Sequence, residues 1–325
     1  MSNTQPAARR RGRGATRRGH PGMRVLWNSR AGKKGGIPTG GASEEELRAL
    51  LDRHGLDAEL LATESEDDCR RLTREAIDEG FKVVIAAGGD GTVGCVAEEL
   101  LDTPVALGIL PLGSVMNIPR MLGVSRELDE AAQILAAGVV REVDVGEANG
   151  QLFYETASVG LNAAMFREAQ GFDEGDYSSP LRTIWVALRY RPARMSLDLE
   201  QGTIHTRALM VAISNGPYTG VGMTVAPEAR LDDGRFDVVV FRHYSKFELL
   251  RHLLSIAFGR RRLTPHARTY HSAHVRVESA SPLPCRADSH DLGPTPLECR
   301  VRRGSLRAVV GPDYRAGRAD PGEDA

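Results

Sequence analysis

Five consecutive residues, Gly88, Gly89, Asp90, Gly91 and Thr92, have the composition of a phosphate-binding turn. They lie between an apolar run that predicts a buried strand and a segment that predicts a helix. Glycines let the backbone turn tightly and bring N–H groups against an anion, and a helix start adds the positive end of its dipole. A carboxylate beside phosphates is unfavourable unless a metal ion or a proton-accepting role compensates for it. The turn therefore predicts phosphate chemistry, and the competing interpretation is a tight turn in which Asp90 caps the helix.

Two further loops follow predicted strands of the same segment. Residues 28–36 (NSRAGKKGG) come after the first apolar run, and residues 111–117 (PLGSVMN) come after the fourth. Ligands of open α/β sheets bind outside the carboxyl ends of the strands, so loops at that edge converge. Each loop alone is typical of a flexible connection, but together with residues 88–92 they predict a nucleotide site.

The elements that must position these loops alternate between strands and helices over about the first 140 residues. Strands are expected at 23–28, 57–63, 82–87 and 106–110, and helices at 43–54, 68–79, 93–101 and 128–137. Ser43 and Glu46 have the spacing of a capping box, which marks one helix start. This alternation predicts βαβ units on a parallel sheet.

The second half of the chain is rich in short β-like runs separated by Gly, Asn and Pro. Asn149-Gly150 is a strong hairpin signal, because both residues accept a positive φ. Helical patterns interrupt the strands at 180–190 and 246–258. We therefore expect an α/β domain followed by a mostly antiparallel β domain.

The composition supports a globular protein of two domains. The chain has 325 residues, with 42 Lys and Arg against 43 Asp and Glu, and 41% hydrophobic residues. These values exclude fibrous and disordered classes, and the length suggests about two domains. No apolar run approaches the roughly 18 residues of a membrane span. The four cysteines form no C-x-x-C pair, so we expect a soluble protein of the reduced cytoplasm.

The amino terminus is basic and carries no acid before Glu44. Its arginines are Arg9, Arg10, Arg11, Arg13, Arg17 and Arg18. No apolar core of a signal peptide follows, so we expect residues 1–22 to form a disordered basic arm. One interpretation is attraction to anionic phospholipid headgroups, at about 1 kcal/mol per basic side chain. The other, slightly favoured, is a solvated tail, and a flexible tail is also expected at 312–325.

The three loops, in this order and spacing, resemble the diacylglycerol kinase catalytic-domain family. This family includes bacterial lipid kinases and is related to sphingosine and ceramide kinases. Its motifs N-P-x-S-G, G-G-D-G-T and P-x-G-T-x-N-D-F-A-R correspond here to NSRAG, GGDGT and PLGSVMNIPR. In the second half, ETASVGLNA, SNGPYTGVGM and APEARLDDGRFD are similar to further family segments. The resemblance extends over residues 23–311, nearly the whole folded chain.

The resemblance implies an α/β plus all-β fold of the NAD kinase/diacylglycerol kinase type. The implied parts are an ATP-binding domain at 23–143, a β-sandwich at 144–304 and a final strand at 305–311 that returns to the first domain. The active site is then expected in the cleft between the two domains. The implied reaction is transfer of the γ-phosphate of ATP, with Mg²⁺, to a lipid hydroxyl.

Functional residues of the family fall on definite positions of this chain. The implied phosphate-binding residues are Gly88, Gly89, Asp90, Gly91 and Thr92, with Asn28, Gly113 and Ser114 beside the nucleotide. The implied catalytic residues are Asp90 and Asp288, either of which accepts or orients the proton of the acceptor hydroxyl. Asp233 and Asp237 fall at a structural Mg²⁺ site, and two carboxylates around a loop glycine suit a hard ion. The alternative for this pair is an ordinary Asp-Gly turn.

Two motifs depart from the family pattern. The family's D-G-E corresponds here to Asp288-Ser289-His290, and its N-D corresponds to Met116-Asn117. Each change removes a carboxylate, which bears on metal binding or on the choice of acceptor. His290 is either a functional innovation or a solvated loop residue, and we favour the second interpretation because a lone histidine without a paired ligand is weak evidence of a site.

The leading hypothesis is a cytoplasmic lipid kinase, peripherally associated with membranes, that phosphorylates diacylglycerol or a related neutral glycerolipid. Residues 160–164 carry no acid suited to a cationic amine, which favours a neutral acceptor. The helix at 180–190 either lines the acceptor channel or simply packs in the core. Arg260, Arg261 and Arg262 are candidates for membrane contact.

Two alternatives stay open. An NAD kinase shares G-G-D-G-T, but its N-x-G-x-L-G-F loop is missing. A catalytically weak nucleotide- or lipid-binding sensor is the other alternative. No nucleic-acid partner is expected, and exposed sheet edges leave a homodimer open.

Overall fold

The structure is a computed structural model that describes residues 22–29, 33–34, 37–38, 41–173, 182, 185–186, 189–220, 222–242 and 267–314. The expected arm before Gly22, the helix at 246–258, residues 260–262 and the tail after Tyr314 lie outside the described residues, as does most of the helix at 180–190. Within these ranges no helix combines the length and apolar character of a membrane span.

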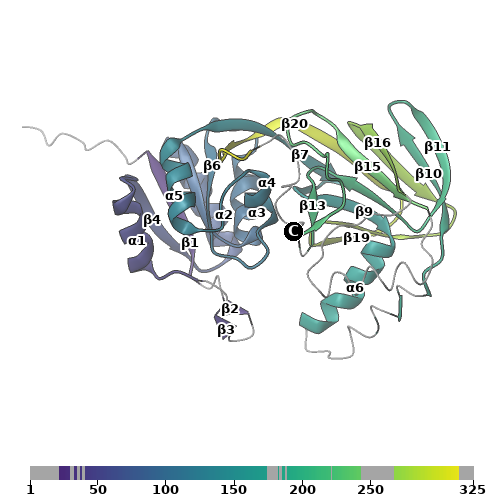
Figure 1. Cartoon of the computed structure of the whole chain (residues 1–325), viewed down its shortest axis with the longest axis horizontal. Helices are drawn as coiled ribbons and strands as arrows, with labels where there is room; N and C mark the ends of the chain where they lie inside the picture. The colour runs from purple at the N-terminus through teal and green to yellow at the C-terminus, as the bar shows by residue number, and fades with distance from the viewer. Residues whose placement is uncertain are drawn as a thin grey trace, which may run out of the picture.

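The first domain is an α/β layer structure around a parallel sheet of strand order β4-β1-β5-β6 (Figure 1). Its strands are β1 (Met23–Asn28), β4 (Ala58–Thr63), β5 (Val83–Gly88) and β6 (Ala106–Pro111), and its helices are α1 (Glu44–Arg53), α2 (Glu66–Asp78), α3 (Asp90–Leu100), α4 (Asn117–Met121) and α5 (Leu128–Ala137). The short strands β2 (Lys33–Lys34) and β3 (Ile37–Pro38) pair in the loop after β1. The predicted parallel α/β domain is confirmed.

Burial explains why the central strands of this sheet are apolar throughout. All six residues of β6 and five of the six in β5 are buried, as in a parallel sheet covered on both faces. Right-handed crossovers in the order β4-β1-β5-β6 place α1 on one face and α2 and α3 on the other. Helix α5 covers β6, where a side chain at Gly108 would meet Leu135 of α5.

Local sequence signals mark the helix ends. Ser43 accepts a hydrogen bond from the backbone N–H of Glu46, whose carboxylate accepts one from the backbone N–H of Ser43. The predicted capping box is therefore present. Helix α5 ends at Gly138, which has φ of +63° and so takes the left-handed conformation that glycine accepts most easily.

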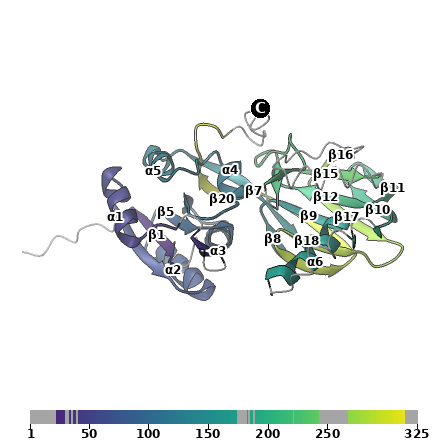
Figure 2. The same cartoon turned by 60° about the horizontal axis from the view of Figure 1, so that its bottom comes forward.

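The second domain packs two antiparallel sheets face to face (Figures 1 and 2). The six-stranded sheet has the order β16-β15-β12-β9-β18-β19, with β16 (Ala267–Ser272), β15 (Phe236–Phe241), β12 (Met210–Ser214), β9 (Thr156–Gly160), β18 (Pro284–Ala287) and β19 (His290–Pro294). The facing strands are β11 (Gly202–Ala208), β10 (Ala193–Leu199), β17 (His274–Ser279), β20 (Leu297–Val309), β7 (Val140–Ala148) and β8 (Gln151–Phe153). Phe153 and Phe236 stack between the sheets with ring centroids 5.5 Å apart, and the predicted antiparallel sandwich is confirmed.

Strands β7 and β20 join the two domains into one sheet. β20 pairs antiparallel with β17 and β7, and near its end Ala308 pairs in parallel with Leu107 of β6. The expected domain boundary at residue 143 falls inside β7. Tyr314 follows β20, and the backbone N–H of Gly311 donates to the carbonyl of Leu122 in the first domain. Backbone pairing therefore holds the domains together on one side of the interface.

Two helices were not predicted from the sequence, and one small sheet completes the interface. Helix α4 has only five residues, one of them Pro119, and this is too short for a helical period to be recognised in the sequence. Helix α6 (Leu161–Asp173) follows β9 directly. Strands β13 (Tyr218–Thr219) and β14 (Met223–Thr224) pair in a hairpin, and the Arg120 guanidinium of α4 lies 3.9 Å from the ring centroid of Tyr218. Thus α4 contacts the second domain, as its place between the lobes in Figure 1 shows.

Candidate active site

The three predicted loops meet at the carboxyl edge of the parallel sheet. Asn28, at the end of β1, donates through Nδ2 to Thr92 Oγ1 over 3.3 Å. The backbone N–H of Leu112 donates to the carbonyl of Gly88 over 2.9 Å. A side chain at Gly113 would lie 2.7 Å from the Cα of Gly89, so these loops pack backbone against backbone. Asn28, Gly88, Gly89, Thr92 and Gly113 are therefore adjacent, while Gly91 and Ser114 are exposed beside them.

Asp90 is the first residue of α3, and its carboxylate faces the third loop in chain order, residues 111–117. Oδ2 accepts hydrogen bonds from the backbone N–H groups of Met116 at 2.9 Å and Asn117 at 3.4 Å, and Oδ1 accepts one from Ile118 at 3.3 Å. Burial raises the pKa of Asp90 above its ordinary value, and these three donors act against that rise. Asp90 thus caps the start of α4 rather than α3, and its role as a base stays a prediction.

Met116 adopts an unusual backbone conformation in this loop. Its φ of +59° and ψ of +48° lie in the left-handed region, although the side chain is buried. A non-glycine residue there costs about 1–2 kcal/mol. The hydrogen bonds to Asp90 hold this conformation in place, as expected where strain is concentrated at a functional site.

Glu155 brings a third carboxylate into the site from the second domain. It lies just before β9 and is 9% exposed. Its Oε2 accepts hydrogen bonds from Nδ2 of Asn117 at 3.0 Å and from the backbone N–H of Gly220 at 3.1 Å. Asn117 Nδ2 also donates to the carbonyl of Gly220 at 2.8 Å. Asn117 and Glu155 therefore link the third loop to the sandwich.

Asp288, the other predicted catalytic residue, lies in the turn between β18 and β19. Its Oδ2 accepts from the backbone N–H of Tyr154 at 2.7 Å, and its Oδ1 accepts from those of Glu155 at 3.1 Å and Thr156 at 3.0 Å. Burial raises the pKa of Asp288, while these donors oppose the rise. Asp288 thus fixes the start of β9 and the backbone of Glu155.

The site concentrates negative charge at the domain junction. Burial raises the pKa of Glu155 well above its ordinary value, and the nearby charges of Asp288 and Asp90 raise it further. Arg286 lies close to both Asp288 and Glu155 and is buried; burial lowers its pKa. Carboxylates with shifted pKa values gathered around one spot mark a candidate functional site.

The predicted Mg²⁺ residues Asp233 and Asp237 contact protein groups in this structure. Asp237 Oδ1 lies 2.7 Å from Nδ1 of His271, and Asp233 Oδ1 accepts from the backbone N–H of Arg235 at 3.0 Å. Across the described ranges, no three His, Cys, Asp or Glu side chains converge in a way that fits a metal ion. The Mg²⁺ site that the resemblance implies at Asp233 and Asp237 therefore stays a prediction.

A different carboxylate, Asp144 of β7, holds the loop that contains Asp233. Its Oδ2 accepts from the backbone N–H of Gly234 at 2.6 Å, and its Oδ1 accepts from that of Gly304 at 2.7 Å. Asp144 is 5% exposed. Charge-assisted hydrogen bonds of Asp144 therefore tie this loop to β7 and to Gly304 of β20.

We expect Asp144→Ala to lower the free energy of unfolding by about 3 kcal/mol, because it leaves the buried N–H of Gly234 and the half-buried N–H of Gly304 without an acceptor. Asp233→Ala should lower it by less than about 1 kcal/mol, because Asp233 makes one exposed contact within its own turn. Denaturant titration of both variants with and without Mg²⁺ measures this. A larger loss for Asp233→Ala, appearing only with Mg²⁺, would contradict the assignment.

His290, which stands for the family's Glu, is exposed at the start of β19. It pairs through its backbone with Ala287 across the β18–β19 hairpin. The carboxylate of Asp288, in contrast, is directed into the protein toward Tyr154 and Thr156. The two ends of this motif therefore have different environments.

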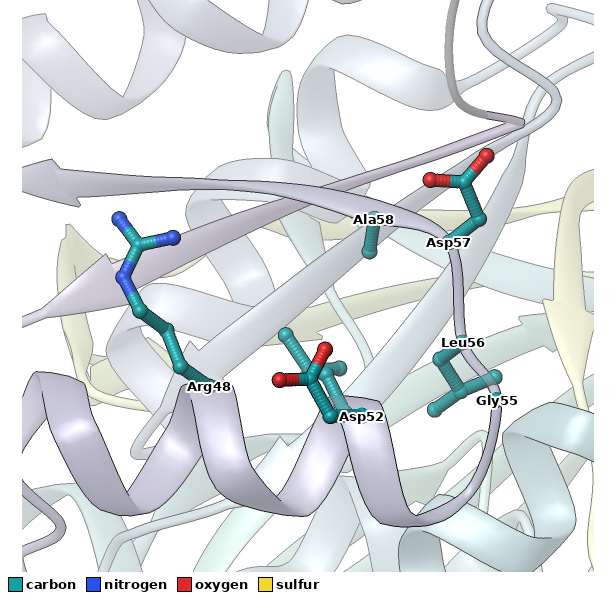
Figure 3. A pocket seen from close by; sticks show the side chains of 7 residues that line it. Arg48, Asp52, Gly55, Leu56, Asp57 and Ala58 are labelled. Carbon is teal, nitrogen blue, oxygen red and sulfur yellow. The ribbon is translucent and has the colours of Figure 1, made fainter.

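A separate pocket lies at the opposite edge of the parallel sheet (Figure 3). It is lined by Arg48, Leu51, Asp52, Gly55, Leu56, Asp57 and Ala58, from the end of α1 and the start of β4. Strand β4 begins there, whereas the three loops follow the carboxyl ends of their strands. The pocket is therefore distinct from the site that contains Asp90.

Family comparisons agree with this two-domain fold. A model of the diacylglycerol kinase catalytic domain matches residues 22–148, and a model of the YegS C-terminal NAD kinase beta sandwich-like domain matches residues 156–310. With these two models the chain is defined as a two-domain kinase, and its candidate active site lies at the domain junction. The chain belongs to the diacylglycerol kinase catalytic-domain family.

Similar proteins are named as lipid kinases or as a diacylglycerol kinase. A "Probable lipid kinase YegS-like" of Chromohalobacter salexigens is 33% identical over 193 residues, a match that covers 57% of this chain and 61% of that relative. A protein of the same name from Pseudomonas aeruginosa PAO1 is 29% identical over 300 residues, 87% of this chain and 95% of the relative. The "Diacylglycerol kinase" of Bacillus subtilis is 26% identical over 245 residues, a match that covers 70% of this chain and 76% of that relative.

A solved structure shares the fold. The crystal structure of a diacylglycerol kinase from Bacillus anthracis str. Sterne superposes with a TM-score of 0.66 at 19% identity, covering 89% of this chain and 97% of that one. The predicted fold class is thereby confirmed.

Proposed function

We propose that this kinase transfers the γ-phosphate of ATP to the hydroxyl of a lipid, and that the acceptor is diacylglycerol or a related neutral glycerolipid. One observation carries the proposal: the glycine-rich loop and the carboxylates of the sandwich meet at one place. The loop supplies backbone N–H groups and a helix start that bind phosphates. The sandwich supplies carboxylates that can take the proton of a hydroxyl. Donor and acceptor sites of a phosphoryl transfer must be adjacent in this way.

The lipid acceptor rests on the relatives and on the composition of the sandwich. The names of the relatives refer to lipid or diacylglycerol. At the start of α6, Leu161, Asn162, Ala163 and Ala164 carry no acid that would attract a cationic amine. We therefore favour a neutral glycerolipid over an amino lipid. Mg²⁺ is expected as the ion that accompanies the phosphates of ATP, and lipid contact is expected at a membrane surface.

We expect Gly113→Ala to weaken ATP binding about tenfold, because an added methyl group would overlap Gly89 and push the glycine-rich loop and the third loop apart. Titration of a fluorescent ATP analogue measures the Kd. The matched control is Gly94→Ala on α3, where the nearest atom to the added methyl group, of Tyr154, is 3.7 Å away. Equal Kd values for the two variants would contradict a phosphate site between these loops.

Transfer of labelled phosphate tests the proposed function. The enzyme is incubated with labelled ATP, Mg²⁺ and a total lipid extract, and the labelled product is separated and identified. The expected product is a phosphorylated glycerolipid, formed by the wild type and by the surface variant Glu130→Gln and lost with EDTA. Nucleotide binding without labelled lipid would favour the sensor hypothesis, and labelled NADP from added NAD would favour the NAD kinase hypothesis.

A further inference from the structure

The third loop lacks a carboxylate that its motif carries, and the structure shows a carboxylate next to the same position. Asn117 stands where the motif has Asp, and its Nδ2 is 3.0 Å from Oε2 of Glu155. An aspartate at 117 would bring two carboxylates into contact, which is unfavourable unless they share a proton. The amide at 117 and the carboxylate at 155 are thus complementary.

We infer that Glu155, from the sandwich domain, replaces the carboxylate missing from the third loop and accepts the proton of the acceptor hydroxyl. This inference rests on the proposed function, since it names the group that completes the same reaction. It differs from the roles that the sequence predicts for Asp90 and Asp288.

Hydrogen bonding separates Glu155 from the other two carboxylates. Both oxygens of Asp90 and both oxygens of Asp288 accept backbone N–H groups, three for each side chain. Glu155 uses only Oε2, and no described residue donates to its Oε1. A base must present a lone pair to the proton it takes, and Oε1 of Glu155 is the one oxygen of these three side chains that accepts no hydrogen bond from a described residue.

A second atom at the same place also points to a ligand. Asn117 is 1% exposed, and its Oδ1 is buried without a hydrogen bond from any described residue. Both of its amide hydrogens are already donated, to Glu155 and to the carbonyl of Gly220. Buried polar atoms are ordinarily bonded, so a polar group of a bound acceptor fits against Asn117 and Glu155.

The surroundings of Glu155 favour proton uptake. The charged groups that face it are Asp90 from α3, Asp288 from the β18–β19 turn and Arg286 from β18. Burial and the two aspartates raise the pKa of Glu155 well above its ordinary value. A carboxylate with a higher proton affinity is a better base for an alcohol.

The step balances as a simple phosphoryl transfer. The O–H bond of the acceptor breaks and its proton moves to Oε1 of Glu155. The acceptor oxygen forms a bond to the γ-phosphorus, while the bond from that phosphorus to the oxygen bridging the β- and γ-phosphates breaks and ADP leaves. Glu155 then returns the proton to solvent.

Exchange of the two side chains tests the inference. Glu155→Gln keeps an oxygen that accepts from Asn117 and Gly220 and should lower kcat about 100-fold, with the KM for ATP changed less than about threefold. Glu155→Asn should lower kcat by a similar factor. The double variant Asn117→Asp with Glu155→Asn should have a kcat at least about tenfold higher than that of Glu155→Asn alone. The control is Glu130→Gln on the exposed face of α5, and thermal melting verifies that each variant is folded.

The outcomes separate this inference from the proposed function. Glu155→Gln with kcat within about threefold of the wild type would overturn the role of Glu155 while the lipid kinase activity stands. The role of Glu155 would also be overturned if the double variant Asn117→Asp with Glu155→Asn were no more active than Glu155→Asn alone. Absence of lipid product with the wild type would overturn the proposed function and this role with it.

Discussion

Asp90→Ala should lower kcat by more than about 100-fold while the chain stays folded. The substitution removes the acceptor of three backbone N–H groups, those of Met116, Asn117 and Ile118. The strained left-handed backbone of Met116 is then free to relax, and Asn117 moves away from Glu155. A displacement of about 1 Å among reacting groups costs about 100-fold in rate, and steady-state transfer of phosphate to lipid measures the loss.

Asp52→Ala is the matched control for this substitution. Asp52 lies in the exposed pocket of Figure 3, at the opposite edge of the sheet. We expect this variant to retain the wild-type kcat within about twofold. A loss at Asp52 as large as at Asp90 would show that the wrong edge of the sheet has been assigned to the reaction.

Asp288→Ala should lower the free energy of unfolding by about 4 kcal/mol, the largest stability effect that we expect. Three buried N–H groups, from Tyr154, Glu155 and Thr156, lose their acceptor. Each unpaired buried donor costs about 1–3 kcal/mol, and relief of the buried carboxylate offsets part of the sum. Chemical denaturation monitored by circular dichroism measures the change.

The control for Asp288→Ala is Asp291→Ala in the same hairpin. Asp291 forms an exposed ion pair with Arg167 and accepts from the backbone N–H of Gly293 at 2.8 Å. An exposed pair contributes about 0–1 kcal/mol, so this variant should lose no more than about 1 kcal/mol. Equal losses for the two variants would contradict the account of Asp288 as the residue that fixes the start of β9.

Local sequence signals predicted most of the first domain. The strand at 23–28 and the helix at 128–137 were predicted with the observed bounds, because an apolar run and a terminal Gly138 mark them clearly. The hairpin at Asn149-Gly150 formed as expected, with both residues at positive φ. Helix α4 was missed, because its capping groups come from Asp90, which lies 26 residues earlier in the chain.

The residues around the phosphate loop could be predicted, and those that complete the site could not. Glycine spacing marks residues 88–92, and Asn28, Gly89, Thr92 and Gly113 are adjacent as expected. Glu155 and Asp144 were missed, since each acts through backbone N–H groups or side chains distant in sequence. The sequence did contain one signal of Glu155: Asn117 stands where the motif has a carboxylate, which suggests that another residue supplies one.

Direct assay of a defined acceptor tests the central claim that this domain junction phosphorylates a lipid hydroxyl. The enzyme is given ATP, Mg²⁺ and either a diacylglycerol in detergent micelles or the same lipid with its hydroxyl blocked as a methyl ether, and lipid-bound phosphate is measured over time. We predict phosphorylated lipid from the first acceptor, none from the second, and at least about a 100-fold slower rate with Asp90→Ala. Wild-type enzyme that binds ATP but leaves the free hydroxyl unphosphorylated would contradict the account.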